Sequence, residues 1–229
     1  MKNCLLFLAV VAAMAVAGPA YSQYVYLDVN GDGLNFDREA LVLNNVPSDN
    51  LTDAVTAIDV YFVTNQHADG SAATCQQSAN NYSLGSYEAV LRYSGSGTVI
   101  FNGWTDALGF TVPIITAGDG TFATSGTDTW FGRGGNPPGL APGVHKVGTI
   151  SVTVTGTPKI DFGTNSTLSG NAQTAFGSQC EGILFVNTIM YGTEQAVIDQ
   201  TADFSESFGT TAQIPVVKST WGKIKTLYH

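Results

Sequence analysis

Charged side chains are scarce in this 229-residue sequence, in which Asp, Glu, Lys and Arg together make up 12% of the chain. Basic residues are the rarest, with 9 Lys and Arg against 18 Asp and Glu, and the net charge is −9. An acidic surface with so few cations repels phosphate backbones, which disfavours nucleic-acid binding. Beyond Ala17 there is no long apolar run, so the sequence predicts no membrane-spanning helix.

Residues that usually carry catalysis are also scarce. The three histidines, His67, His145 and His229, do not have the spacing of a zinc site, and a G-x-S-x-G nucleophile motif is missing. The carboxylates that could pair for acid–base catalysis are Asp59, Glu88, Asp106, Asp128 and Glu181. Any acidic β protein offers such pairs, so they do not indicate a hydrolase. The sequence therefore predicts a non-catalytic protein.

The first 22 residues have the pattern of a secretory signal peptide. Lys2 precedes an apolar run from Leu5 to Ala17 that is too short to span a bilayer. Ala20 and Ser22 fit the small-x-small rule, so we expect cleavage after Ser22. The mature protein is therefore expected to be secreted, and to be extracellular or at the cell surface.

Loss of the signal peptide leaves two cysteines, Cys75 and Cys180. In an oxidising compartment an isolated pair is expected to form one disulfide. Closing a loop of roughly 100 residues stabilises the fold by about 4–5 kcal/mol in the chain-entropy account.

The remaining sequence is rich in glycine, with 26 residues, and in short runs of β-branched and aromatic side chains. The expected strands are 24–29, 56–64, 86–94, 97–105, 145–156, 158–163 and 182–192. Turn-forming segments at 94–97, 117–120, 132–139 and 163–171 separate them. This pattern predicts an all-β, two-layer antiparallel β-sandwich of Ig-like or jelly-roll type, with one or two short helices at 37–46 and 219–229. We expect one domain over 23–201, then a polar linker and basic tail over 202–229.

The acidic run DVNGDGLNFDRE (28–39), called here the acidic loop, satisfies the EF-hand calcium pattern. Oxygen side chains stand at its first, third and fifth positions, and Gly33 supplies the sharp turn. The expected Ca²⁺ ligands are Asp28, Asn30, Asp32, the Leu34 carbonyl and Glu39. The bare alternative is an Asx-type turn between a strand and a helix.

The segment DVNGDG resembles the dockerin-type calcium loops of secreted proteins, and this resemblance implies calcium binding. A second matching loop and paired helices are absent from the sequence. The resemblance therefore does not imply a cohesin partner, and a structural role for calcium is expected ahead of a regulatory one.

The body of the chain, about residues 55 to 190, resembles the cohesin-like and carbohydrate-binding β-sandwiches of secreted bacterial proteins. The segments that carry this likeness are YEAVLRYSGSGTVIF and LAPGVHKVGTISVTVTG. It implies a binding or scaffolding module. Trp130 and Phe131, in an expected loop over 127–139, are the candidate glycan-binding aromatics, whereas Trp104 is expected in the core. Aromatic side chains that anchor their own loop are the alternative.

The last residues resemble, in layout only, the C-terminal sorting signals of some secreted bacterial proteins. The residues concerned are Lys218, Trp221, Lys223 and Lys225. The alternative is a terminal helix or strand docked on the domain.

Together these features predict a secreted, non-catalytic adhesion, scaffold or surface-assembly protein with a structural calcium site. The alternatives are a carbohydrate-binding module and a subunit of an extracellular filament. The expected partners are a glycan or a protein at the cell surface, or further copies of the chain.

Overall fold

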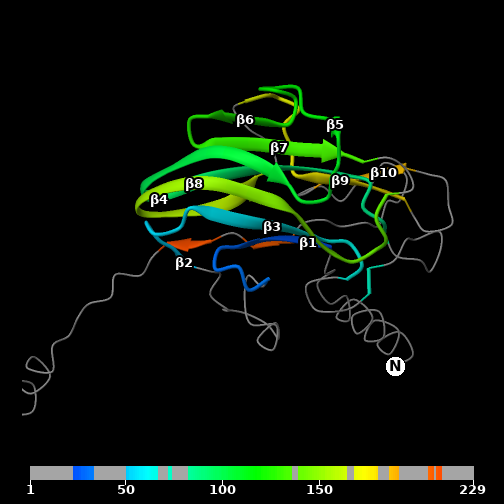
Figure 1. The fold of residues 1–229 in the computed structure, drawn as a ribbon, viewed down its shortest axis with the longest axis horizontal. Helices are drawn as coiled ribbons and strands as arrows, with labels where there is room; N and C mark the ends of the chain where they lie inside the picture. Colours follow the sequence, from blue (N-terminus) through cyan, green and yellow to red (C-terminus); the bar gives the residue numbers. More distant parts are fainter. Residues whose placement is uncertain are drawn as a thin grey trace, which may run out of the picture.

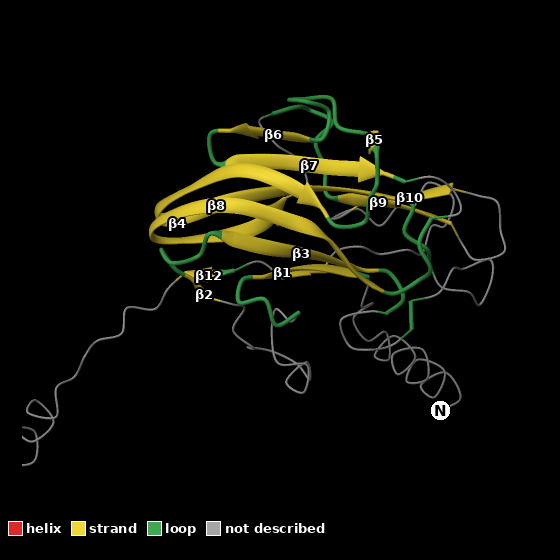
Figure 2. Cartoon of the chain, viewed as in Figure 1, coloured by secondary structure: helices red, strands yellow, loops and turns green. Residues whose placement is uncertain are grey.

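The computed structural model describes residues 23–33, 50–66, 72–73, 82–135, 139–163, 168–179, 186–190, 206–208 and 210–212. Every regular element in these residues is a β-strand (Figure 2). The described part of the chain contains no helix long and apolar enough to cross a membrane. The signal peptide (1–22) and the two expected helices (37–46 and 219–229) lie outside the described residues.

The strands follow one another along the whole described chain. They are β1 (Tyr24–Asp28), β2 (Asn50–Leu51), β3 (Ala57–Val63), β4 (Ser86–Asp106), β5 (Val112–Pro113), β6 (Phe122–Ser125), β7 (Asp128–Gly134), β8 (Val144–Gly163), β9 (Ala175–Gln179), β10 (Val186–Met190), β11 (Glu206–Phe208) and β12 (Thr211–Ala212).

One large sheet contains ten of these strands, in the order β10-β9-β4-β8-β3-β1-β11, with β7 paired to β4, and β5 and β6 paired to β7 (Figure 1). A second, two-stranded sheet pairs β12 with β2. The pairings are antiparallel except for β1 with β11 and β2 with β12, which are parallel. The sheet strands therefore confirm the all-β prediction.

The two longest strands fold the large sheet into two layers. β4 and β8 pair from Val90↔Gly163 to Asp106↔Gly148, with one shift of register between Phe101 and Gly103. Seventeen residues of extended strand span roughly 56 Å, yet the rings of Tyr87 and Trp104, at opposite ends of β4, have centroids 6.1 Å apart. β4 must therefore turn back on itself, and Figure 1 shows β4 and β8 curving together from one layer to the other. The result is a two-layer β-sandwich.

Glycines allow this bend. Gly97 has φ 137 and Gly156 has φ 81, a left-handed region that other residues rarely adopt. A Cβ on Gly97 would lie 2.1 Å from the carbonyl oxygen of Thr155 on the paired strand. Segment 94–97, expected as a turn between two strands, is instead the bend inside one strand. The expected strands 145–156 and 158–163 likewise merge into β8.

The core lies between the layers. Trp104, in the second half of β4, stacks on Phe131 of β7 with centroids 4.0 Å apart. Phe62 of β3 meets Phe176 of β9 edge-on at 6.3 Å. The alternation expected for 56–64 and 145–156 is confirmed: buried side chains alternate with more exposed ones along most of β3 and through Ile150–Thr155 of β8. Trp104 belongs to the core, as expected.

Two short stretches beyond the boundary expected at residue 201 pair with strands of the sandwich. Residues 206–208 pair with Tyr24–Tyr26, and residues 211–212 pair with Asn50–Leu51. Between them the Thr210 amide donates to the Ile160 carbonyl at 2.8 Å, and its hydroxyl accepts from the Ile160 amide at 2.9 Å. The first stretch thus lies at the edge of the large sheet, and the second forms the two-stranded sheet with β2.

Candidate functional site

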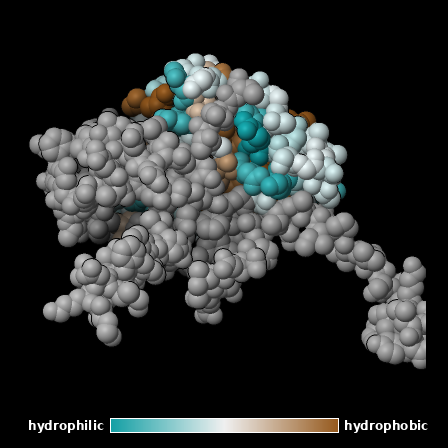
Figure 3. Space-filling model, turned by 180° about the vertical axis from the view of Figure 1, so that it is seen from behind, coloured by the Kyte–Doolittle hydropathy of each residue, from teal (hydrophilic) through white to brown (hydrophobic). Residues whose placement is uncertain are grey.

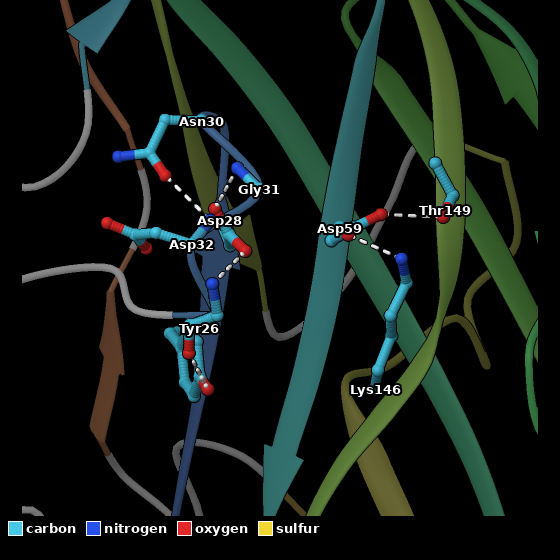
Figure 4. A network of polar contacts seen from close by, with 9 residues as sticks. Tyr26, Asp28, Asn30, Gly31, Asp32, Asp59, Lys146 and Thr149 are labelled. Carbon is cyan, nitrogen blue, oxygen red and sulfur yellow. Dashed lines mark hydrogen bonds and ion pairs between the residues drawn. The ribbon is translucent and has the colours of Figure 1, made fainter.

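The acidic loop begins where β1 ends. The Asp28 residue is 1% exposed, and both carboxylate oxygens accept backbone hydrogen bonds (Figure 4). Oδ1 accepts from the Gly31 amide at 2.7 Å, and Oδ2 accepts from the Gly33 amide at 2.8 Å. Both glycines have φ near +80° (79 and 81), in the left-handed region that side chains other than glycine rarely adopt. The conformation of the turn therefore favours glycine at both positions.

Two further contacts hold the turn together. The Asn30 side-chain oxygen accepts from the Asp32 amide at 2.9 Å. The Tyr26 hydroxyl donates to the Gly33 carbonyl at 2.8 Å, while its ring stacks on Tyr61 of β3 with centroids 4.7 Å apart and planes 1° from parallel. Tyr26 thereby ties the turn to the sheet. Asn30 and Asp32 themselves are exposed.

A second carboxylate lies beside Asp28 on the neighbouring strand. Asp59 of β3 stands opposite Asp28 in the sheet register. Its oxygens bind the Lys146 ammonium at 2.5 Å and the Thr149 hydroxyl at 2.6 Å (Figure 4). The hydrogen bond to Asp59 raises the pKa of Lys146, and burial, followed by the charges of Asp28 and Asp59, raises the pKa of Tyr61. The end of β1 is thus a region of negative potential in which Lys146 balances one carboxylate.

The donor set at the turn suits a hard cation. A carboxylate has about four lone-pair directions, and the two amides use one on each Asp28 oxygen. Asp28, Asn30 and Asp32 supply carboxylate and amide oxygens, which Ca²⁺ prefers. Leu34 and Glu39 lie outside the described residues. Within the described residues no group of three His, Cys, Asp or Glu side chains is placed to hold a metal.

The expected surface position of Trp130 and Phe131 is wrong. Trp130 is 2% exposed and Phe131 is fully buried. Most of the expected loop is strand β7, which is covered on both faces. Phe131 packs into the main core, and Trp130 packs into a smaller cluster with Val90, Ile115 and Ala123. These two aromatics are therefore structural.

The Trp130 indole nitrogen donates to a Glu88 oxygen at 2.9 Å, and the Gln173 amide donates to the other oxygen at 2.7 Å. Burial raises the pKa of Glu88, while these two hydrogen bonds act in the opposite direction. Sequence reasoning missed this network because Gln173 is 85 residues from Glu88. No local pattern links the two residues.

The other described carboxylates from the sequence analysis also have separate partners. Asp59 binds Lys146, Asp106 accepts from the Tyr87 hydroxyl and the Phe110 amide, and Asp128 binds Arg92. Each is held by a different part of the sheet, and each has a structural contact. Glu181 lies outside the described residues.

Exposed large hydrophobic side chains in the described residues are aliphatic: Ile100, Val112 and Val144. In the coloured part of the face shown in Figure 3, hydrophobic residues form separate small patches among polar ones. The described surface therefore does not present a row of aromatic rings of the kind that would favour glycan binding. Cys75, Cys180 and the tail residues Lys218, Trp221, Lys223 and Lys225 lie outside the described residues.

No protein-family model matches the chain, and no curated protein matches it. Two cohesins are similar in structure. The seventh ScaB type I cohesin from Pseudobacteroides cellulosolvens matches with TM-score 0.40 and 10% identity over 86% of this chain and 96% of that chain. The sixth cohesin of scaffoldin B from Acetivibrio cellulolyticus, crystallised with a Cel5 dockerin mutant, matches with TM-score 0.39 and 6% identity over 84% and 99%. These likenesses concern the β-sandwich architecture alone.

Proposed function

We propose that the chain is a secreted, non-catalytic β-sandwich that serves as an adhesion, scaffold or surface-assembly component outside the cell, and that its acidic loop holds a structural calcium ion. The signal-peptide pattern supports secretion, and a protein partner at the cell surface is the proposed kind of ligand.

The observation that carries the calcium proposal is the buried carboxylate of Asp28. It stands at the end of β1, with Asp59 opposite it in the sheet. Burying a carboxylate is costly unless it is paired and hydrogen-bonded. The two amides satisfy part of this need, and a cation at the turn would balance the remaining charge.

The ligands proposed for the ion are the side chains of Asp28, Asn30 and Asp32, the Leu34 carbonyl and Glu39. Bound calcium would supply positive charge and oxygen coordination that fix the turn. The chain's own part is to hold Asp28 in place through the amides of Gly31 and Gly33. The ion would thereby join β1, which is buried on both faces, to the segment that follows it.

The test is thermal unfolding of the mature protein in calcium and in EDTA. At a calcium concentration 100 times the dissociation constant, binding adds about 2.7 kcal/mol to the free energy of unfolding. For a chain of this size that corresponds to a melting temperature higher by about 5–11 °C. Asp32→Ala should remove most of this shift, because it deletes one of the proposed calcium ligands. Since Asp32 is exposed, losing its side chain should cost the calcium-free protein little stability.

Asp119→Ala is the matched control. Asp119 is also an exposed turn carboxylate, and it accepts from the Thr121 and Phe122 amides at 2.8 Å. This variant should keep the full calcium shift. Identical melting curves with and without calcium in the parent protein would reduce the acidic loop to a turn.

A second candidate function, a subunit of an extracellular filament, is favoured by the way residues 206–212 join the sheet. Residues 206–208 form β11 on the edge of β1, and an edge that accepts this segment from its own chain can accept it from a neighbour. We expect light scattering to detect assemblies that a synthetic peptide of residues 204–214 reduces in mass. A protein that stays monomeric at every concentration contradicts this candidate.

A further inference from the structure

Gln23 occupies an unusual position, because it directly follows the expected cleavage site and precedes β1. The residue is 1% exposed, and the next residue, Tyr24, is 2% exposed. Tyr24 pairs with Val63 of β3 on one side and with Glu206 of β11 on the other. Cleavage after Ser22 would therefore create a new chain end directly before the first residue of β1 and not on a free tail.

A new chain end at this place brings a charge with it. An α-amino group has a pKa of about 7.7–8.0 and is mostly protonated at neutral pH. Burial disfavours such a charge unless it is paired. Asp28 and Asp59 are described carboxylates of β1 and β3, but they lie at the far end of β1, roughly 16 Å along the strand.

The Gln23 side chain offers a way to remove the charge. Its oxygen, Oε1, is buried and has no hydrogen-bond partner in the described structure. The side-chain amide carbon is placed by covalent geometry to form a five-membered ring with the α-nitrogen of the same residue. Glutamine is thus the residue type whose own side chain can neutralise a chain end.

We propose that the mature N-terminus is a pyroglutamate formed from Gln23, a modification that rests on the proposed secretion and cleavage after Ser22. The unprotonated α-nitrogen attacks Cδ of the side-chain amide. A bond forms between the α-nitrogen and Cδ, the Cδ–Nε2 bond breaks, and Nε2 leaves as ammonia with a proton from the α-amine. No oxidant, reductant or co-reactant is needed.

The product suits the buried site better than the free amine does. The lactam is neutral, and its ring N–H replaces a charged ammonium at the start of β1. The buried Oε1 stays as the ring carbonyl oxygen. A retained ammonium is the competing arrangement, and it predicts an uncyclised chain.

The test is mass spectrometry of the protein secreted from the full-length gene with its own leader. We expect an intact mass lower by one ammonia than that of residues 23–229 with a free amine, and an N-terminal peptide that starts at residue 23 and resists Edman degradation. Pyroglutamyl aminopeptidase acting on the unfolded protein should expose Tyr24 as the new end. The variant Gln23→Ala keeps the cleavage site but cannot cyclise.

Comparison of melting temperatures separates a neutral end from a charged one. Because burial lowers the pKa of an amine, the Gln23→Ala protein should melt below the parent at pH 6. Its deficit should shrink as the pH rises toward the ordinary amine value of about 8. Fully cyclised parent protein cannot show this dependence, since it has no terminal amine.

Two results would overturn the proposal, and they differ in what else they affect. A chain that starts at residue 23 with a free amine removes the modification and leaves secretion intact. A chain that starts elsewhere removes the modification together with the expected cleavage site. Neither result bears on the calcium shift, which depends on residues 28–39.

Discussion

Replacing Asp28 with alanine separates the turn's own stability from that of bound calcium. In EDTA the ion makes no contribution, so any loss of stability comes from the two backbone hydrogen bonds that the carboxylate accepts. These bonds hold the amides of Gly31 and Gly33, and without the carboxylate both amides need another acceptor.

The size of the loss follows from the exposure of the groups left behind. A hydrogen bond to a charged group contributes roughly 1.5–3 kcal/mol. Because Asp28 accepts two such bonds, the upper limit for the loss of stability is near twice that value. Gly31 is exposed and Gly33 is half-buried, so water can replace much of the loss. Removal of Asp28 also relieves its repulsion by Asp59. We therefore expect Asp28→Ala to cost about 2 kcal/mol and to lower the melting temperature by about 4–8 °C.

The assay is thermal unfolding of the parent, Asp28→Ala and Asp28→Asn proteins in EDTA. Asp28→Asn keeps one side-chain oxygen acceptor, so it should lose about half as much stability. An Asp28→Ala protein with the same melting temperature as the parent in EDTA would refute the argument that the carboxylate holds the turn. A loss confined to the calcium-containing samples would do the same.

Two further substitutions test the bend and a buried charge. Gly97→Ala should cost about 3 kcal/mol or more, because its φ is 137 and the new Cβ would meet the Thr155 oxygen. Gly103→Ala, in the same strand with open space around it, should cost far less in urea unfolding, and equal losses would contradict the account of the bend. Arg92→Ala should cost about 3 kcal/mol, because it strips the fully buried Asp128 of two contacts at 2.7 Å. A loss below about 1 kcal/mol, typical of exposed ion pairs, would contradict the argument that this pair behaves as a buried one.

Much of the fold could be predicted because strand periodicity is a local property. The alternation in 56–64 and 145–156 fixes which side chains face the core, and it is confirmed in β3 and β8. The turn after β1 could also be predicted, since Asp28, Gly31 and Gly33 interact within six residues. The calcium ligation and the disulfide stay predictions.

The rest depends on partners far away in the sequence. Segment 94–97 has the composition of a turn, but its pairing with 156–159 of β8 keeps it in the sheet as a bend. Trp130 has the glycine-rich neighbours of a surface loop, yet β7 is covered on both faces by segments that no local pattern connects to it.

Sequence alone determined the strand class, the faces of the strands and the glycine-dependent turn at the end of β1, because each arises from neighbours within a few residues. Tertiary structure alone decided which strands merged, that Trp130 and Phe131 are buried, and that residues 206–208 and 211–212 pair with β1 and β2. Backbone hydrogen bonding at a sheet edge is indifferent to side-chain identity, so short segments such as 206–208 and 211–212 become strands once an edge is within reach.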